Sequence, residues 1–440
     1  MPQVKKTIDP KKQYVFPEKL NIIHYNSKIL VIAVEIGNWI VLENERQLEF
    51  FTLLKTNTVE KSLELFTGDQ KDAVETVIQI EAKRFENQII TKTDKRNQMM
   101  IYLTNACNMR CPHCFMYADY TKENEITADE IIGFLKAFKE NGGEQVTFSG
   151  GEVTTRTDFS QIIKRTYQLG LKINVYTNGT LWTDEMIDDL SPCISEVQIS
   201  IDGYNEEENA RVRGKGNFEK ALVTVEKFVN LGIKTRVAIT PFFDKGLEDK
   251  KQQYIDFGNN LLKKYKGKKF SIRFSGEILK GREVSLTKEQ NKLYGKIIEE
   301  ISSKTIQIIG ESIFVESHKN FRVFDNCSYG NTYLSSTGDI FPCSRIFELK
   351  PYANIRKDSY EKIFAISKKA KFLTNVDNLE PCSSCHLKYI CGGGCRLVHF
   401  KNVPSIEDFD SAKIEPRVCT EAEKEYFYDL MIKSNKDIFQ

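Results

Sequence analysis

Six strand-like segments alternate with six helical segments between about residues 98 and 304, and this alternation limits the fold more than any other feature of the chain. A strand, a helix and a further strand in succession require parallel strands joined by crossover helices. The pattern therefore predicts an α/β domain, either an open partial barrel or a doubly wound sheet, with ligand chemistry at the carboxyl ends of the strands. The strand segments read MMIYLT, QVTFSG, KINVYTNG, VQISIDG, TRVAIT and FSIRFSG.

The residues from Ile22 to about Phe85 form a separate pattern of three short apolar runs followed by three helical segments. This order predicts a small winged-helix-like α+β module, whose middle helix would present basic residues to DNA. That segment, TVEKSLELF, holds more glutamate than lysine, and the whole chain has 63 Lys and Arg against 61 Asp and Glu, a net charge of +2. The sequence therefore disfavours a nucleic-acid partner.

The cysteine content indicates metal binding rather than disulfides. Eleven cysteines are many for a cytosolic chain, and an odd number argues against a fully paired secreted framework. The N-terminal residues show no apolar run after the lysines, and no stretch of about 18 apolar residues occurs anywhere. We therefore expect a cytoplasmic protein with no membrane partner, in which thiolates hold metal.

Three cysteines follow the first barrel strand, in the segment TNACNMRCPHCF: Cys107, Cys111 and Cys114. Three thiolates on one short loop can hold three corners of an iron-sulfur cubane and leave the fourth iron open for a ligand. A zinc loop is the alternative, but structural zinc takes four ligands and His113 is the one further candidate nearby. The position of the loop at the carboxyl end of a barrel strand favours an active site over a peripheral zinc site.

The C-x3-C-x2-C spacing after the first strand of a six-unit barrel resembles the radical S-adenosylmethionine (radical SAM) superfamily. The second strand ends in SGGE, similar to the glycine-glycine-glutamate motif with which that family binds the methionine amino group of SAM. The third strand ends in YTNG, and the fourth in SIDG, followed by ARVRG with Arg211 and Arg213. For the Asp-Gly pair of SIDG a simple turn is the alternative. The resemblance implies that the residues in contact with SAM are Gly150, Gly151, Glu152, Ser200, Asp202 and Arg213.

The last 120 residues or so lose the strand-helix alternation and hold seven cysteines. Their spacing resembles the SPASM domain, which carries two auxiliary 4Fe-4S clusters, so the whole chain is expected to hold three such clusters; zinc ribbons are the alternative. By resemblance, the outer auxiliary cluster is held by Cys382, Cys385, Cys391 and Cys419. The inner one is held by Cys327, Cys343 and Cys395.

The ligand count leaves two irons open. The first cluster keeps one for SAM, and the inner auxiliary cluster keeps another unless Asp325, Tyr333, water or the substrate supplies a ligand. An open inner cluster would favour cysteine substrates, and full ligation would favour carbon-carbon closure. Cys193 is left over as an expected buried thiol.

The resemblance implies a partial (β/α)6 TIM-like barrel at residues 93–310, a SPASM domain at 311–440, and an N-terminal winged-helix-like domain at 1–92 similar to a leader-peptide recognition element. We therefore expect a maturase that uses a 5′-deoxyadenosyl radical to install a thioether or carbon-carbon crosslink in a ribosomal precursor peptide. Its partners would be that peptide and an electron donor such as flavodoxin or ferredoxin.

Other branches stay open. Sulfatase-maturing enzymes typically place an aspartate after the second auxiliary cysteine, where this chain has Ser344. A quinohemoprotein-crosslinking enzyme would act on a larger folded substrate, and a cluster-bearing electron-transfer scaffold would make no radical. The acid-base residues cannot be assigned from the sequence. Arg273 and Glu277, on and after the sixth strand, are the polar residues expected to face the barrel, as a salt-bridged structural pair rather than as catalysts.

Overall fold

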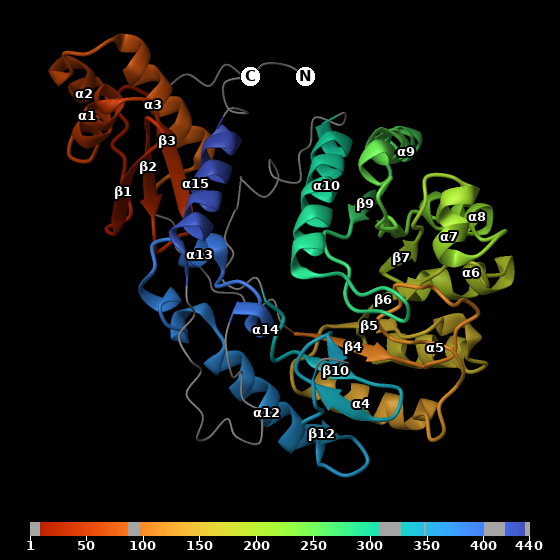
Figure 1. Ribbon diagram of the computed structural model, residues 1–440. Helices are drawn as coiled ribbons and strands as arrows, with labels where there is room; N and C mark the ends of the chain where they lie inside the picture. Colours follow the sequence, from red (N-terminus) through yellow and green to blue (C-terminus); the bar gives the residue numbers. More distant parts are fainter. Residues whose placement is uncertain (1–8, 87–96, 308–326, 347–348, 400–418, 436–440) are drawn as a thin grey trace.

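The computed structural model describes residues 9–86, 97–307, 327–346, 349–399 and 419–435. An N-terminal unit, a barrel and a C-terminal cysteine-rich region follow one another along the chain (Figure 1). In the part of the chain that the structure describes, no helix is long and apolar enough to cross a membrane.

The N-terminal unit holds the three strands and three helices that the sequence predicts. Its antiparallel sheet has the order β1-β2-β3, and each helix begins at a side-chain cap that accepts a backbone N–H bond, supplied by Asn44, Thr58 and Asp69. Phe50, Phe51 and Ile80 are fully buried between the sheet and the helices. The elements are β1 (Leu20–Tyr25), β2 (Lys28–Ala33), β3 (Asn38–Leu42), α1 (Glu45–Leu54), α2 (Val59–Leu65) and α3 (Gln70–Lys83).

The barrel contains the six predicted strands, all parallel and paired in chain order. They are β4 (Gln98–Tyr102), β5 (Gln145–Ser149), β6 (Lys172–Thr177), β7 (Glu196–Ser200), β8 (Lys234–Ile239) and β9 (Phe270–Phe274). Helices cover the outside of this curved sheet (Figure 1), which confirms the α/β prediction. They are α4 (Ala128–Glu140), α5 (Phe159–Gln168), α6 (Asp184–Leu190), α7 (Glu206–Arg213), α8 (Phe218–Asn230), α9 (Lys251–Lys264) and α10 (Lys288–Gln307).

Side chains alternate along every barrel strand, because successive residues point to opposite faces of a sheet. On the outer face, Val146, Ile173, Val197 and Val237 are fully buried against the helices. The alternate positions point into the barrel interior and are mainly polar. In register across the strands they include Tyr102, Ser149, Tyr176, Gln198, Arg236 and Ser271.

The C-terminal region has more regular structure than the sequence suggests. Its strand β10 pairs parallel with β4, with Thr332 opposite Met99, so three short strands extend the barrel sheet beyond its first strand. Long-range pairing of this kind leaves no local sequence signal, since three-residue strands show no periodicity. The elements are β10 (Thr332–Leu334), β11 (Asp339–Phe341), β12 (Ala353–Asn354), α12 (Tyr360–Leu373), α13 (Lys388–Cys391), α14 (Arg396–His399) and α15 (Glu421–Asn435).

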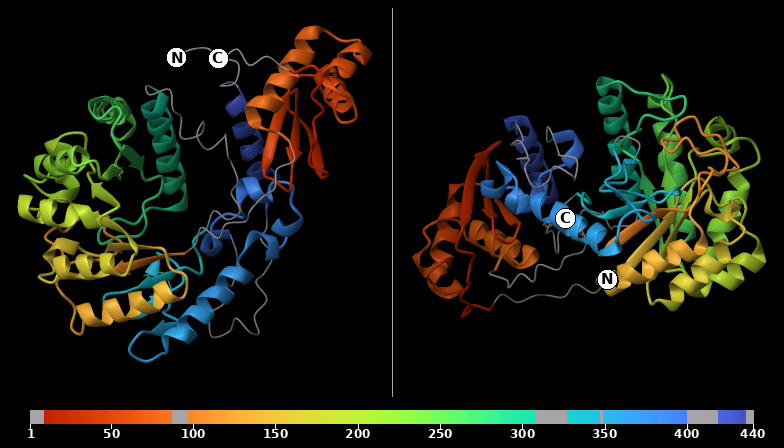
Figure 2. Two further views of the ribbon diagram at one scale, coloured as in Figure 1. Left: turned by 180° about the vertical axis from the view of Figure 1, so that it is seen from behind. Right: turned by 90° about the horizontal axis from the view of Figure 1, so that it is seen from below.

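The N-terminal unit packs on the C-terminal region. Figure 2 shows α15 beside the small sheet in both views. Leu30 and Trp39 share an apolar cluster with Ile390 and Met431. This cluster fixes the N-terminal unit against the segment that carries the last cysteines.

Candidate active site

The first cysteine loop follows β4 and lies against the loop after β5. The backbone N–H of Gly151 donates to the Thr104 carbonyl at 2.8 Å, and that of Glu152 donates to the Ala106 carbonyl at 2.8 Å. Gly150 has φ +131°, and a Cβ on Gly151 would lie 2.1 Å from the Ala106 oxygen. Both glycines therefore permit the close approach of these two backbones.

Cys107, Cys111 and Cys114 converge on this loop. Burial raises the pKa of Cys107 to about 11, and the charges of Cys111 and Cys114 raise it further. Burial also raises the pKa of Cys111, which Arg213 opposes. Three partly buried thiols this close together would be stabilised as thiolates by positive charge between them, such as that of iron.

Glu152 is fully buried at the same rim. Its carboxylate accepts hydrogen bonds from Thr177 Oγ1 at 2.6 Å, from the Asn178 backbone N–H at 2.7 Å and from Thr154 Oγ1 at 2.7 Å. These three partners were not predicted as site residues, although Thr177 and Asn178 belong to the YTNG segment that ends the third strand. Their donors hold the carboxylate in one orientation at the carboxyl ends of β5 and β6.

Asp202 and Arg213 form an ion pair beside the cysteine loop. Arg213 Nε lies 2.7 Å from Asp202 Oδ2, and the Thr240 backbone N–H donates to Asp202 Oδ1 at 2.8 Å. Asp202 is 1% exposed, so it has a structural role beyond a simple turn. Arg213 reaches this place from α7, a helix that the sequence did not predict, whereas Arg211 pairs with Glu208 of the same helix.

His113 lies 3.5 Å from the same carboxylate oxygen of Asp202. Burial lowers the pKa of His113 and keeps the imidazole neutral, although Asp202 opposes this shift. In the ranges that the structure describes, no three His, Cys, Asp or Glu side chains gather tightly enough to chelate a single metal ion.

The four cysteines predicted for the outer auxiliary cluster line one cavity. It has a volume of about 260 Å³ and is bounded by Cys382, Cys385, Cys391 and Cys419 together with side chains of α15. Cysteines that span 37 positions of the sequence, from Cys382 to Cys419, thus line one cavity. Four thiols around a common space are the arrangement that a cubane requires.

The three cysteines predicted for the inner set also lie together. Burial raises the pKa of Cys343, and the nearby Cys327 and Cys395 raise it further. Tyr333 donates to Ser328 Oγ at 2.7 Å, so its hydroxyl is engaged in a hydrogen bond. Asp325, the other residue considered as a fourth ligand, lies outside the described residues.

Two further expectations have definite outcomes. The pairing of Glu277 with Arg273 is wrong: Glu277 lies past the end of β9 and forms an ion pair with Arg345 at 2.5 Å, across the barrel mouth. Cys193 is only partly buried, at the end of a short 3-10 helix (Ser191–Cys193).

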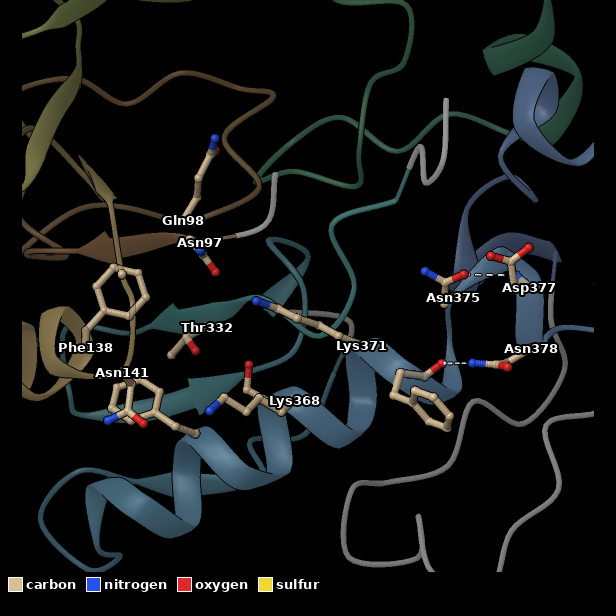
Figure 3. Close-up of a pocket in the computed structure, with 14 residues that line it drawn as sticks. Asn97, Gln98, Phe138, Asn141, Thr332, Lys368, Lys371, Asn375, Asp377 and Asn378 are labelled. Carbon is tan, nitrogen blue, oxygen red and sulfur yellow. Dashed lines mark hydrogen bonds between the residues drawn. The ribbon is translucent and has the colours of Figure 1, made fainter. Parts of the chain in front are cut away.

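A larger cavity of about 570 Å³ lies at the other end of the strands. It is lined by Asn97 and Gln98, at the amino end of β4, and by Lys368 and Lys371 of α12, and Figure 3 shows the Lys371 side chain extending toward Asn97. Parallel barrels place their chemistry at the carboxyl ends of the strands. This cavity is therefore separate from the cysteine loop and from Glu152.

Residues 101–257 match the family model described as the radical SAM superfamily, and this range covers the cysteine loop, Glu152 and Arg213. The chain is a radical SAM enzyme. It uses SAM and a 4Fe-4S cluster, and it is related to SPASM peptide maturases.

Among its relatives, the AdoMet-dependent heme synthase of Methanosarcina barkeri is 27% identical, over 67% of this chain and 89% of its own length. The antilisterial bacteriocin subtilosin biosynthesis protein AlbA of Bacillus subtilis is 25% identical over 66% of this chain and 64% of its own length. The PqqA peptide cyclase of Bradyrhizobium diazoefficiens is 26% identical over 69% of this chain and 82% of its own length.

The fold is similar to solved structures of this kind. The crystal structure of Streptococcus suis SuiB covers 87% of this chain and 96% of its own, with a TM-score of 0.50 and 17% identity. At that identity the similarity concerns the fold alone.

Proposed function

We propose that this radical SAM enzyme is a maturase that crosslinks a ribosomal precursor peptide, through a thioether or a carbon-carbon bond. Two relatives named above act, by their names, in bacteriocin biosynthesis and on the PqqA peptide, while a third is a heme synthase. The observation that favours a peptide is the open outer edge of β1 in the N-terminal unit. An extended leader segment can add to such an edge as a further strand.

The other edge of the small sheet is closed by side chains. The Val41 backbone N–H donates to Gln79 Oε1 at 2.9 Å, and the Val41 carbonyl accepts from Asn435 Nδ2 at 3.4 Å. The Glu43 backbone N–H donates to Gln47 Oε1 at 2.9 Å. Gln47 and Gln79 are fully buried. A leader strand would have to displace these bonds to pair with β3.

The edge of β1 has no such cover. The backbone N–H and C=O of Val41 point away from β2, toward Gln79 and Asn435. In an antiparallel pair, directly opposite residues either exchange both backbone hydrogen bonds or exchange neither. The backbone groups of Leu30, which lies opposite Val41, therefore point toward Ile23 of β1. Ile22 and His24 therefore direct their backbone groups away from the sheet, and among the described residues these groups have no hydrogen-bond partner. The Ile22 side chain is 42% exposed. The proposed leader-recognition domain comprises residues 1–92, and its contact strand is β1.

The site residues have separate proposed roles. Cys107, Cys111 and Cys114 would hold the cluster to which SAM binds, and Glu152, fixed by Thr177 and Asn178, would accept from the SAM amino group. Gly150, Gly151, Ser200, Asp202 and Arg213 complete the proposed SAM site. Bound there, SAM would supply a 5′-deoxyadenosyl radical able to take a hydrogen atom from the peptide. A donor such as flavodoxin or ferredoxin would supply the electron.

Two auxiliary 4Fe-4S clusters are proposed for the remaining cysteine sets. Once bound, these clusters would supply an acceptor for the electron that is released when the peptide radical closes into the crosslink. The seven cysteines are Cys382, Cys385, Cys391 and Cys419 for the outer cluster and Cys327, Cys343 and Cys395 for the inner one. A protein-modifying enzyme of the sulfatase-maturing or quinohemoprotein-crosslinking type is the second candidate. Ser344 in place of an aspartate counts against the first of these.

The test is to co-express the chain with each short peptide encoded beside its gene and to measure peptide mass and 5′-deoxyadenosine anaerobically. A maturase removes two hydrogen atoms from one such peptide. Ile22→Pro removes an outward N–H and should abolish peptide binding, whereas Ile22→Thr, which keeps the N–H, should bind nearly as the parent does. Equal binding by both variants would refute the role of β1, and an unchanged peptide would refute the maturase.

A further inference from the structure

The barrel interior holds a positive charge without a partner close to the proposed SAM site. Ser200, Ala238 and Arg273 lie in register on the neighbouring strands β7, β8 and β9. With strands about 4.8 Å apart, the backbone of Arg273 is about 10 Å from that of Ser200. Ala238, between them, contributes only a methyl group. This row of side chains, Ser200, Ala238 and Arg273, therefore leaves space in front of the Arg273 guanidinium.

The neighbouring charges in the interior are balanced among themselves. Four residues nearer the amino end of β7, Glu196 pairs with Lys234 at 2.8 Å and with Arg236 at 3.1 Å. Glu277, the carboxylate nearest to Arg273 in sequence, forms an ion pair with Arg345. Among the described residues Arg273 forms no ion pair and donates no hydrogen bond. It is exposed, but to the inside of an open barrel.

Other groups in the interior face the same space. Arg236 and Arg273 both act on Tyr176 across the barrel and oppose the rise in its pKa that burial causes, which places both guanidinium groups on the inner face. Gln198 Oε1 is buried without a hydrogen-bond partner. The next inward-facing row toward the amino ends of the strands contains Tyr176, Gln198 and Arg236, which lie in register on adjacent strands.

We propose that Arg273, assisted by Arg236, binds a carboxylate of the substrate and so selects an acidic group next to the reacting carbon. A planar guanidinium matches a carboxylate with two parallel hydrogen bonds, and Gln198 offers an acceptor for a backbone or amide N–H beside it. The inference rests on the proposed function, because it assumes that a peptide enters the barrel. The carboxylate is that of an aspartate or glutamate side chain or of a chain terminus.

The test uses small probes, so that it does not require the precursor peptide. Anaerobically reconstituted enzyme, SAM and dithionite are mixed with side-chain-deuterated acetyl-glutamate amide, acetyl-glutamine amide or acetyl-glutamine with a free terminus. Abstraction moves deuterium from the probe to 5′-deoxyadenosine, and the probe radical then takes an electron from dithionite and a proton from water. The readout is the fraction of 5′-deoxyadenosine that carries deuterium, measured by mass spectrometry.

With the parent, we expect acetyl-glutamate amide to label about tenfold more than acetyl-glutamine amide, which is the value of one charge-assisted hydrogen bond. Arg273→Ala should lower the labelled fraction to the glutamine level, Arg273→Lys should retain part of it, and Lys268→Ala, an exposed cation before β9, should match the parent. Labelling by the free-terminus probe alone would assign the site to a terminal carboxylate and still support the proposal.

Three results would overturn the proposal: equal labelling by the charged and neutral probes, no labelling while 5′-deoxyadenosine forms, or a raised KM for SAM in Arg273→Ala, which would assign the arginine to the cofactor. Failure of the parent to form 5′-deoxyadenosine would instead contradict the radical chemistry itself.

Discussion

Replacement of Gly151 by alanine tests the close contact between the two loops that build the proposed SAM site. An added Cβ would lie 2.1 Å from the Ala106 carbonyl oxygen and 2.9 Å from that of Asn105. Since real Cβ contacts stay above 3.0 Å, the cysteine loop would have to move by about 0.9 Å or more. The obstacle is backbone, so no side-chain rotation can relieve it.

The free-energy cost of Gly151→Ala follows from the contacts that this movement of the loop would break. Overpacking costs about 1–3 kcal/mol. Loss of the bonds from Gly151 to Thr104 and from Glu152 to Ala106 adds about 0.5–1.5 kcal/mol each. The sum is about 2–6 kcal/mol, and it falls on the loop that carries Cys107. We therefore expect Gly151→Ala to fold its N-terminal unit but to lose the first cluster and SAM cleavage.

The assay is iron per chain and 5′-deoxyadenosine formed after anaerobic reconstitution. Gly276→Ala is the matched control, because a Cβ there meets nothing within 4 Å and its φ is not positive. This control should match the parent in both measurements. Full iron content and normal 5′-deoxyadenosine formation in Gly151→Ala would refute the reasoning.

Three further predictions concern the clusters, the buried ion pair and the contact between barrel and C-terminal region. The triple variant Cys107→Ala, Cys111→Ala, Cys114→Ala should fall from about twelve irons per chain to about eight and form no 5′-deoxyadenosine, while zinc in place of iron would contradict the cluster assignment. Asp202→Asn leaves Arg213 buried without its counter-charge and should lower the free energy of unfolding by about 3–5 kcal/mol in denaturant titrations; a change below 1 kcal/mol would contradict this. Arg356 holds the pKa of Glu130 down from 4.5 to about 2, so the pair stabilises the fold above pH 4.5 and this contribution is lost as the pH falls toward 2. The difference in denaturant midpoint between the parent and Glu130→Gln should therefore shrink over that range, and a constant difference would argue against the ion pair.

The sequence predicted well wherever the signal was local. All six barrel strands and the three strands and helices of the N-terminal unit follow from periodicity, because a strand or helix buries its apolar face at a fixed spacing. The first cysteine set follows from a fixed spacing after a strand and the other two from a spacing pattern in the C-terminal region, and the structure places the members of each set near one another. The helix that carries Arg213 was missed, since its segment is mostly charged and shows little apolar periodicity.

The sequence by itself determined the barrel strands, the loop of Cys107, Cys111 and Cys114, and the glycine-glycine-glutamate motif, because these depend on residues a few positions apart. Only the tertiary structure decided which groups meet across the chain. It paired Glu277 with Arg345 and left Arg273 alone in the barrel, it closed the edge of β3 with Gln79 and Asn435, and it joined β10 to β4. These contacts link residues far apart in the sequence. The residues around a charged side chain or an edge strand do not indicate which distant residue will pair with it.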